Sequence, residues 1–134
     1  MTRTLAREVH ERAKGRCEYC RLPSDVYPLP FHFDHIVARQ HGGRTVSENL
    51  ALACLHCNLH KGPNIAGADP TTGEIARLSH PRIDEWRDRF EWAGAALRGI
   101  TVTGRVTIHV LAVNDPDFLA MRRALIDEQT FSTD

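Results

Sequence analysis

Hydrophobic positions near the N-terminus recur at helical spacing. Leu5, Val9 and Ala13 follow one another at intervals of four residues, with charged residues between them. This pattern is typical of an amphipathic helix with one apolar face, and Gly15 is a residue at which such a helix commonly ends. The sequence therefore predicts an N-terminal helix whose apolar face packs on the segment that follows.

A shorter period appears after residue 30. The segment FHFDHI at 31–36 alternates apolar and polar residues like a short strand, and NLALAC at 49–54 does the same. Between them QHGGRT at 40–45 contains the turn-forming residues, and CLHCNLHKG at 54–62 indicates a short helix that ends before a proline. The predicted order is strand, loop, strand, helix.

The second half of the chain is less clearly patterned. Residues 63–80 are rich in glycine and proline, and we expect a loop there. Residues 104–114, GRVTIHVLAVN, fit a strand and a helix equally well. Residues 115–129 predict a helix with Asp115 as its N-terminal cap and Pro116 in its first turn.

Three aromatic residues lie between these segments. We interpret Trp86, Phe90 and Trp92 as core residues, because base stacking on a nucleic acid would require an exposed and basic setting.

Composition limits the class of protein. The chain has 134 residues, of which 42% are hydrophobic, enough for one ordinary core. No apolar run approaches the roughly 18 residues of a membrane span, so we expect a cytoplasmic protein with no membrane partner.

The net charge is zero, but residues 1–61 carry nine basic and six acidic residues. A phosphate-binding surface is therefore expected in the first half.

The four cysteines form two CxxC pairs, Cys17 with Cys20 and Cys54 with Cys57. Two such pairs can present four thiolates to one tetrahedral zinc ion. Disulfides or a redox pair are the rival interpretations, but the sequence has no secretory signal and no βαβ pattern beside either pair. We therefore predict one structural zinc.

The combined array of residues resembles the HNH endonuclease family, whose core is the ββα-metal finger. The residues that carry the resemblance are Cys17, Cys20, Asp34, His35, Ile36, Asn49, Leu50, Cys54, Cys57, Asn58 and Lys61. The loop HKGPNIAGADPTTG is similar to small stand-alone bacterial members with two CxxC knuckles. The resemblance covers about the first half of the chain and implies a ββα-metal core. We therefore expect an α+β fold with a zinc-stapled ββα-metal core over 1–66 that includes an N-terminal helix, and a C-terminal α/β extension over 67–134 packed on the core in the same compact domain.

The family also implies roles for particular residues. It places the general base at His35, and histidine suits this task because it titrates near neutral pH. It places the catalytic metal on Asp34 and Asn58, an oxygen-rich pair that favours Mg²⁺ or Mn²⁺. Asn58 could instead be a helix cap. The family assigns Asn49 to fixing the loop between the strands.

Nucleic acid is the partner that the resemblance implies. We expect DNA as the substrate, with RNA not excluded, and phosphate contacts from Arg39, His41 and Lys61. His56 and His60 are expected to face solvent or phosphate. The predicted function is metal-dependent hydrolysis of phosphodiester bonds. The alternatives are a non-catalytic zinc module that only binds nucleic acid and a disulfide-stabilised interaction domain.

Overall fold

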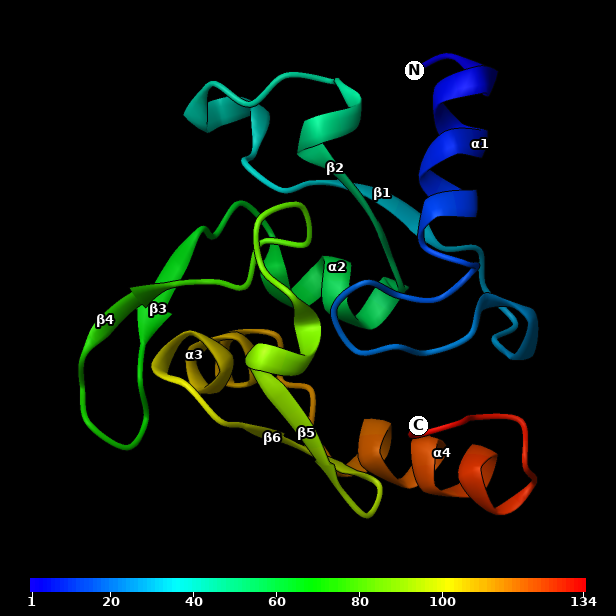
Figure 1. The fold of residues 1–134 in the computed structure, drawn as a ribbon, viewed down its shortest axis with the longest axis vertical. Helices are drawn as coiled ribbons and strands as arrows, with labels where there is room; N and C mark the ends of the chain where they lie inside the picture. The colour runs from blue at the N-terminus through cyan, green and yellow to red at the C-terminus, as the bar shows by residue number, and fades with distance from the viewer.

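A short hairpin and the helix after it form the centre of the fold. The computed structural model describes residues 1–134 as an α+β protein with three separate two-stranded antiparallel sheets. Figure 1 shows helix α2 at mid-height, with α1 and the first hairpin above it and the C-terminal elements below. The helices are α1 Arg3–Arg12, α2 Leu55–Lys61, α3 Val102–Val110 and α4 Pro116–Asp127, and the strands are β1 His32–His35, β2 Leu50–Ala53, β3 Ala66–Ala68, β4 Ile75–Arg77, β5 Phe90–Ala93 and β6 Ala96–Gly99. None of the helices is both long and apolar enough to cross a bilayer.

The predicted order of strand, loop, strand and helix is confirmed. Strands β1 and β2 pair in a register that places His35 opposite Leu50 and His32 opposite Ala53. Since Cys54 follows Ala53 directly, the cysteine end of the hairpin lies at the start of β1 and His35 lies at its far end. Helix α2 then begins after Cys54, whose sulfur accepts a bond from the Cys57 N–H.

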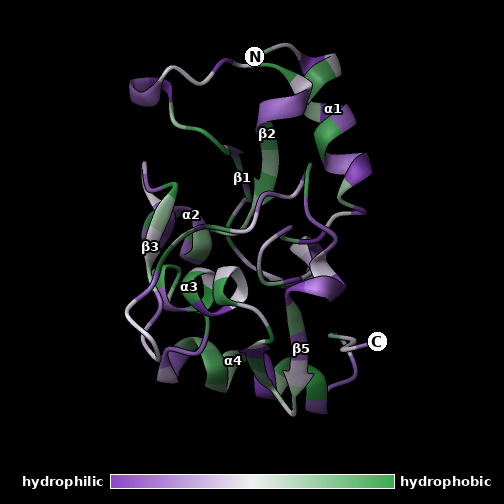
Figure 2. Cartoon of the chain, turned by 60° about the vertical axis from the view of Figure 1, so that its left-hand side comes forward, coloured by the Kyte–Doolittle hydropathy of each residue, from purple (hydrophilic) through white to green (hydrophobic).

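Helix α1 packs on this hairpin as predicted. Its N-cap is Thr2, whose hydroxyl accepts a bond from the Leu5 N–H at 3.1 Å. Val9 and Ala13 are buried against Leu50 and Leu52 of β2. Figure 2 shows the resulting bands of hydrophobic and hydrophilic colour along α1. The helix therefore braces the strand that leads into the second cysteine pair.

The C-terminal extension shares its core with the first half of the chain. All four cysteines belong to a cluster of buried residues that also contains Leu78, Phe90, Val106 and Phe118. The Trp86 indole N–H donates to the carbonyl of Tyr19 at 3.0 Å, and Arg82 forms an ion pair with Glu18. The extension is therefore packed on the ββα core, as the sequence predicted.

Residues 63–80 are not only loop, which corrects the sequence prediction. Strands β3 and β4 form a hairpin of three residue pairs within this segment. Gly67 allows the hairpin to lie directly on α3, because a Cβ atom there would approach within 2.6 Å of Val110 Cγ2. The turn is held by Asp69, whose carboxylate accepts bonds from the Thr71 N–H and the Thr72 hydroxyl.

The ambiguous segment after residue 100 is the helix α3. Its N-cap is Thr101, whose hydroxyl accepts a bond from the Gly104 N–H at 3.0 Å. Val106 and Thr107 are buried, and the Thr107 hydroxyl accepts a bond from the Ser79 N–H at 2.8 Å. The predicted helix α4 is also present, with Asp115 at the N-cap position, although its side chain makes no capping hydrogen bond.

Candidate active site and metal centre

The four cysteines form one buried cluster. Their sulfur atoms all lie within 4.8 Å of one another, and no disulfide joins them. A tetrahedral zinc ion with Zn–S bonds of about 2.3 Å places its sulfurs about 3.8 Å apart. The sulfurs of Cys20 and Cys54 are 3.7 Å apart. In each pair the N–H of the second cysteine points at the first sulfur, at 3.5 Å in Cys17–Cys20 and 3.4 Å in Cys54–Cys57. The donor set and its spacing therefore fit a structural zinc ion.

His35 lies at the end of β1 and is partly exposed. Its Nε2 atom is 2.8 Å from the hydroxyl of Thr45, in the loop between the two strands. The neighbouring Asp34 is buried, so the alternation of the strand directs the two side chains to opposite faces. The imidazole therefore faces the loop, and the carboxylate faces the interior of the finger. Thr45 was not identified from the sequence, because nothing distinguishes this threonine from an ordinary loop residue.

Asn49 connects the two ends of the loop between the strands. Its side-chain oxygen accepts a bond from the Val37 N–H at 2.9 Å, and its amide donates to the carbonyls of Val37 and Arg44 at 3.0 and 2.9 Å. Gly43 makes this closure possible, because a Cβ atom there would lie 1.7 Å from the Val37 carbonyl oxygen. The loop contacts are those expected for Asn49, and its contribution to catalysis stays a prediction.

Replacing Asn49 with alanine should loosen this loop. We expect Asn49→Ala to lower the free energy of unfolding by about 2–3 kcal/mol, because three hydrogen bonds to backbone groups are lost at once. Urea unfolding of the zinc-loaded protein measures this difference. Asn64→Ala is the matched control, since Asn64 is exposed and its side chain makes no hydrogen bond. A loss below about 0.5 kcal/mol at Asn49 would contradict the role in loop closure.

Asp34 is the centre of a buried polar cluster. Its carboxylate accepts a 2.7 Å bond from the Tyr19 hydroxyl and lies 3.2 Å from the ammonium of Lys61. The same ammonium donates to the carbonyls of His35 and Ile36, both at 3.1 Å. Burial raises the pKa of Asp34, although Lys61 and Tyr19 act in the opposite direction. Lys61 therefore fixes the end of β1 at His35, the residue predicted to be the general base.

Lys61 does not face solvent. Only 1% of it is exposed, and its ammonium is enclosed by protein oxygen atoms. The structure therefore does not support the predicted phosphate contact at Lys61. The sequence gave no indication of this placement, because a lysine near the end of a short helix usually lies at the surface. Tyr19 was missed as well, although a hydroxyl-bearing aromatic between two cysteine ligands is the signal that could have identified it.

The other predicted residues are more accessible. Asn58 lies within α2, partly exposed, and its side chain makes no hydrogen bond. The N-cap of α2 is Cys54, so Asn58 is not a helix cap. Arg39 and His41 are exposed on a short 3₁₀ turn in the loop after β1, and neither forms an ion pair. Both are free to contact a nucleic acid.

His56 packs against the C-terminal extension, which corrects its expected exposure. Its ring stacks on Phe118 with the centroids 3.9 Å apart and an interplanar angle of 10°. Its Nε2 atom is 2.9 Å from the Ala112 carbonyl, and burial lowers its pKa. His60 is exposed, and its ring nitrogen bonds to the His56 carbonyl at 2.8 Å. His56 therefore fixes α2 against α4.

Asp34 and Asn58 together offer the oxygen donors that a hard divalent ion prefers. The amide of Asn58 has no competing partner. The carboxylate of Asp34 is shared with Tyr19 and Lys61, and only 4% of the residue is exposed. An ion bound there would have to share the carboxylate with the Lys61 ammonium or displace it.

Comparison with known proteins agrees with this geometry. The model of the HNH endonuclease family matches residues 17–64. The chain is also 25% identical over 125 residues to the Septu protein PtuB of Bacillus thuringiensis, which covers 92% of this chain and 46% of that protein. The chain thus spans about half the length of the curated relative it matches. No solved structure matches significantly. Residues 17–64, which hold the cysteine cluster and His35, therefore form a domain of the HNH endonuclease family.

Proposed function

We propose that the protein is a metal-dependent endonuclease that hydrolyses phosphodiester bonds in DNA. The observation that carries this proposal is the match of residues 17–64 to the HNH family in a segment where His35 stands at a strand end beside an accessible loop. Nuclease chemistry is a property of the family. The choice of DNA and the roles of single residues are our proposal.

His35 is proposed as the general base that takes a proton from the attacking water. Its imidazole is partly exposed, so water can reach it, and the hydroxyl of Thr45 at 2.8 Å holds the ring in place. Lys61 fixes the backbone at His35 and Ile36, and Asn49 fixes it at Val37, through the hydrogen bonds described above. Such rigid support keeps a base within hydrogen-bond reach of its water.

Asp34 and Asn58 are proposed to hold Mg²⁺ or Mn²⁺. When bound, such an ion stabilises negative charge on the phosphate and on the leaving oxygen. Arg39 and His41 are proposed to contact the DNA backbone, because both are exposed in the loop that follows His35. These contacts position the phosphate near the base.

A non-catalytic zinc module that only binds nucleic acid is the second candidate. The observation that favours it is the buried ion pair of Asp34 with Lys61, which occupies the carboxylate that the catalytic ion needs. A cleavage assay separates the two candidates, because only an endonuclease converts supercoiled plasmid to nicked or linear forms.

The test uses plasmid DNA with Mg²⁺ or Mn²⁺ added to the zinc-loaded protein. We expect cleavage by the wild type and a loss of about 10²-fold or more in Asn58→Ala, with unchanged zinc content and melting temperature. Asn64→Ala is the control and should cleave normally. Asp34→Ala is a less selective test than Asn58→Ala, because it leaves the Lys61 ammonium buried without its anion, at a cost of about 3–5 kcal/mol.

Absence of metal-dependent cleavage by the wild type would contradict the endonuclease proposal. Normal cleavage by Asn58→Ala would remove Asn58 from the metal site. In that case Asp34 alone would remain as the proposed protein ligand.

A further inference from the structure

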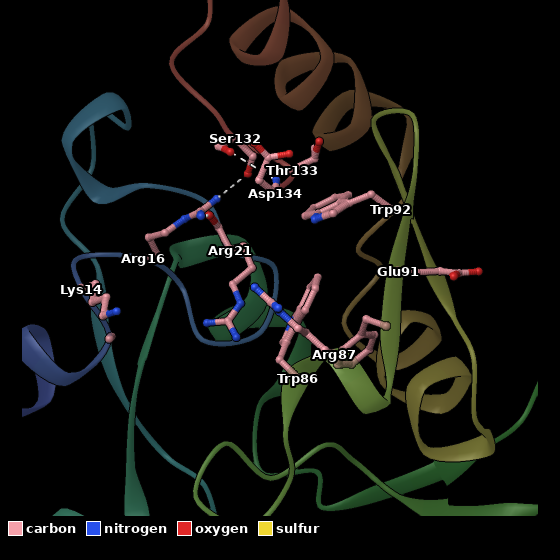
Figure 3. Close-up of a pocket in the computed structure, with 12 residues that line it drawn as sticks. Lys14, Arg16, Arg21, Trp86, Arg87, Glu91, Trp92, Ser132, Thr133 and Asp134 are labelled. Carbon is pink, nitrogen blue, oxygen red and sulfur yellow. Dashed lines mark hydrogen bonds between the residues drawn. The ribbon is translucent and has the colours of Figure 1, made fainter.

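A cavity of about 650 Å³ lies between the first cysteine knuckle and the C-terminal extension. Figure 3 shows side chains converging on it from three segments that are distant in the sequence. The segment around residues 13–21 contributes one wall, the segment 86–92 with strand β5 contributes another, and residues 132–134 contribute a third. Both tryptophans of the chain lie in its lining.

Basic side chains outnumber acidic ones in the lining of the cavity. Its basic side chains are Lys14, Arg16, Arg21 and Arg87, and none of them forms an ion pair with a carboxylate. Glu91 also borders the cavity, but its carboxylate pairs with Arg98 and points away in Figure 3. Asp134 is the other acidic residue of the lining. The cavity therefore suits a ligand that carries negative charge.

Arg21 is the side chain best placed to bind such a ligand. It is half-buried, and its guanidinium lies over the ring of Trp86, 4.9 Å from the centroid. No side-chain hydrogen bond of Arg21 to a protein acceptor is present, whereas the neighbouring Arg16 donates to the carbonyls of Arg21 and Ser132. Burial lowers the pKa of Arg21. A partly desolvated guanidinium with free donors is the type of group that binds phosphate oxygens.

The aromatic lining adds a second requirement. The rings of Trp86 and Trp92 are both half-buried, with centroids 5.8 Å apart and an interplanar angle of 39°. The Trp86 ring is fixed by the hydrogen bond of its indole N–H to the Tyr19 carbonyl. The sequence alone indicated core aromatics, since stacking with bases needs a basic and accessible setting. In the structure both rings are partly exposed beside basic side chains, although Trp92 also packs against Phe131 and Arg122.

We propose that this cavity binds an unpaired nucleotide of a nucleic-acid strand, with a phosphate on Arg21 and Arg87 and the base against the tryptophan rings. A base can reach rings inside a hollow only when it is not paired in a duplex, and stacking on aromatic residues tolerates any base. This inference rests on the proposed function, because it takes the substrate to be a nucleic acid.

The position of the cavity makes it a second contact, separate from the base. It borders the knuckle of Cys17 and Cys20, at the start of β1, whereas His35 ends the same strand. Three residues of extended chain separate the two ends by roughly 10 Å. The cavity and His35 therefore lie at opposite ends of β1 and would contact different parts of a bound strand. Single-stranded or branched DNA offers the unpaired nucleotide that this arrangement requires.

Intrinsic fluorescence tests the proposal directly, because the only two tryptophans line the cavity. The zinc-loaded protein without added Mg²⁺ is titrated with a short oligothymidylate. We expect saturable quenching, with affinity weakened about fivefold or more in Arg21→Gln and in Arg87→Gln. Arg123→Gln is the matched control, since Arg123 is exposed on α4 and makes no ion pair or hydrogen bond. Its affinity should equal that of the wild type.

Three results would overturn the proposal. They are the absence of a fluorescence response, equal affinities in the wild type and both cavity variants, and tighter binding of a polyglutamate peptide, which would make the cavity a site for an acidic protein. The readout is binding, so it is independent of the plasmid assay. A protein that cleaves plasmid without a fluorescence response refutes the cavity alone, and a protein that responds without cleaving refutes only the proposed catalysis.

Discussion

Cys54→Ser is expected to unfold the core of the protein and to abolish zinc binding. All four cysteines are fully buried within the main hydrophobic cluster, which also includes residues of the C-terminal extension. Structural zinc contributes on the order of 10 kcal/mol of apparent binding free energy at neutral pH, which is comparable to the whole stability of a domain. The loss of one thiolate therefore removes a contribution that the small core cannot replace.

Elemental analysis and thermal unfolding measure this effect. We expect one zinc per wild-type chain and a cooperative transition that disappears in Cys54→Ser. Treatment of the wild type with a strong chelator should reproduce the loss, and re-addition of zinc should restore the transition. A wild type without zinc, or a Cys54→Ser protein that melts like the wild type, would refute the structural role of the metal.

The spacing of a few residues was sufficient to predict the ββα core. Two CxxC pairs can meet only if the chain between them returns on itself, and the alternation in 31–36 and 49–54 supplied two strands for that return. The short helix followed from the second knuckle. These features are local in sequence, and each constrains the others, which is why the predicted order matched the structure.

The parts that could not be predicted depend on contacts between distant segments. The β3–β4 hairpin has only three residues in each strand, too few to show a period, and it is supported by α3 through Gly67. Helix α3 carries a strand-like alternation that tertiary packing overrides. The ammonium of Lys61, at the end of α2, binds the backbone at the end of β1. No sequence pattern predicts this contact between distant residues.

The buried position of Lys61 changes the interpretation of Asp34. From the sequence, Asp34 is expected only to bind the catalytic metal. In the structure the carboxylate also neutralises a buried ammonium that holds the His35 carbonyl at 3.1 Å. Asp34 therefore supports the position of the proposed base whether or not an ion binds it. A variant of Asp34 affects stability, metal binding and base geometry together, whereas a variant of His35 affects the chemistry more selectively.

His35→Ala is expected to lower the rate of cleavage by about 10²-fold or more, the usual contribution of a positioned general base. Binding of DNA and zinc should hardly change, because the imidazole makes a single hydrogen bond, to Thr45 at the edge of the loop. The measurement is single-turnover cleavage of plasmid DNA at saturating metal. His109→Ala is the matched control, since His109 is exposed on α3, in the extension beyond the HNH domain.

The pH dependence distinguishes a base from a residue that only positions substrate. A protonated imidazole has no lone pair with which to accept a proton, so the wild-type rate should fall as the pH is lowered from about 8.5 to 5.5. In His35→Ala this dependence should disappear, leaving a low rate that varies little over the same range. If His35→Ala instead cleaves within about threefold of the wild type, or keeps the wild-type pH profile, His35 is not the base. The exposed His41 in the adjacent loop, or a metal-bound hydroxide acting without a protein base, would then account for activation of the water.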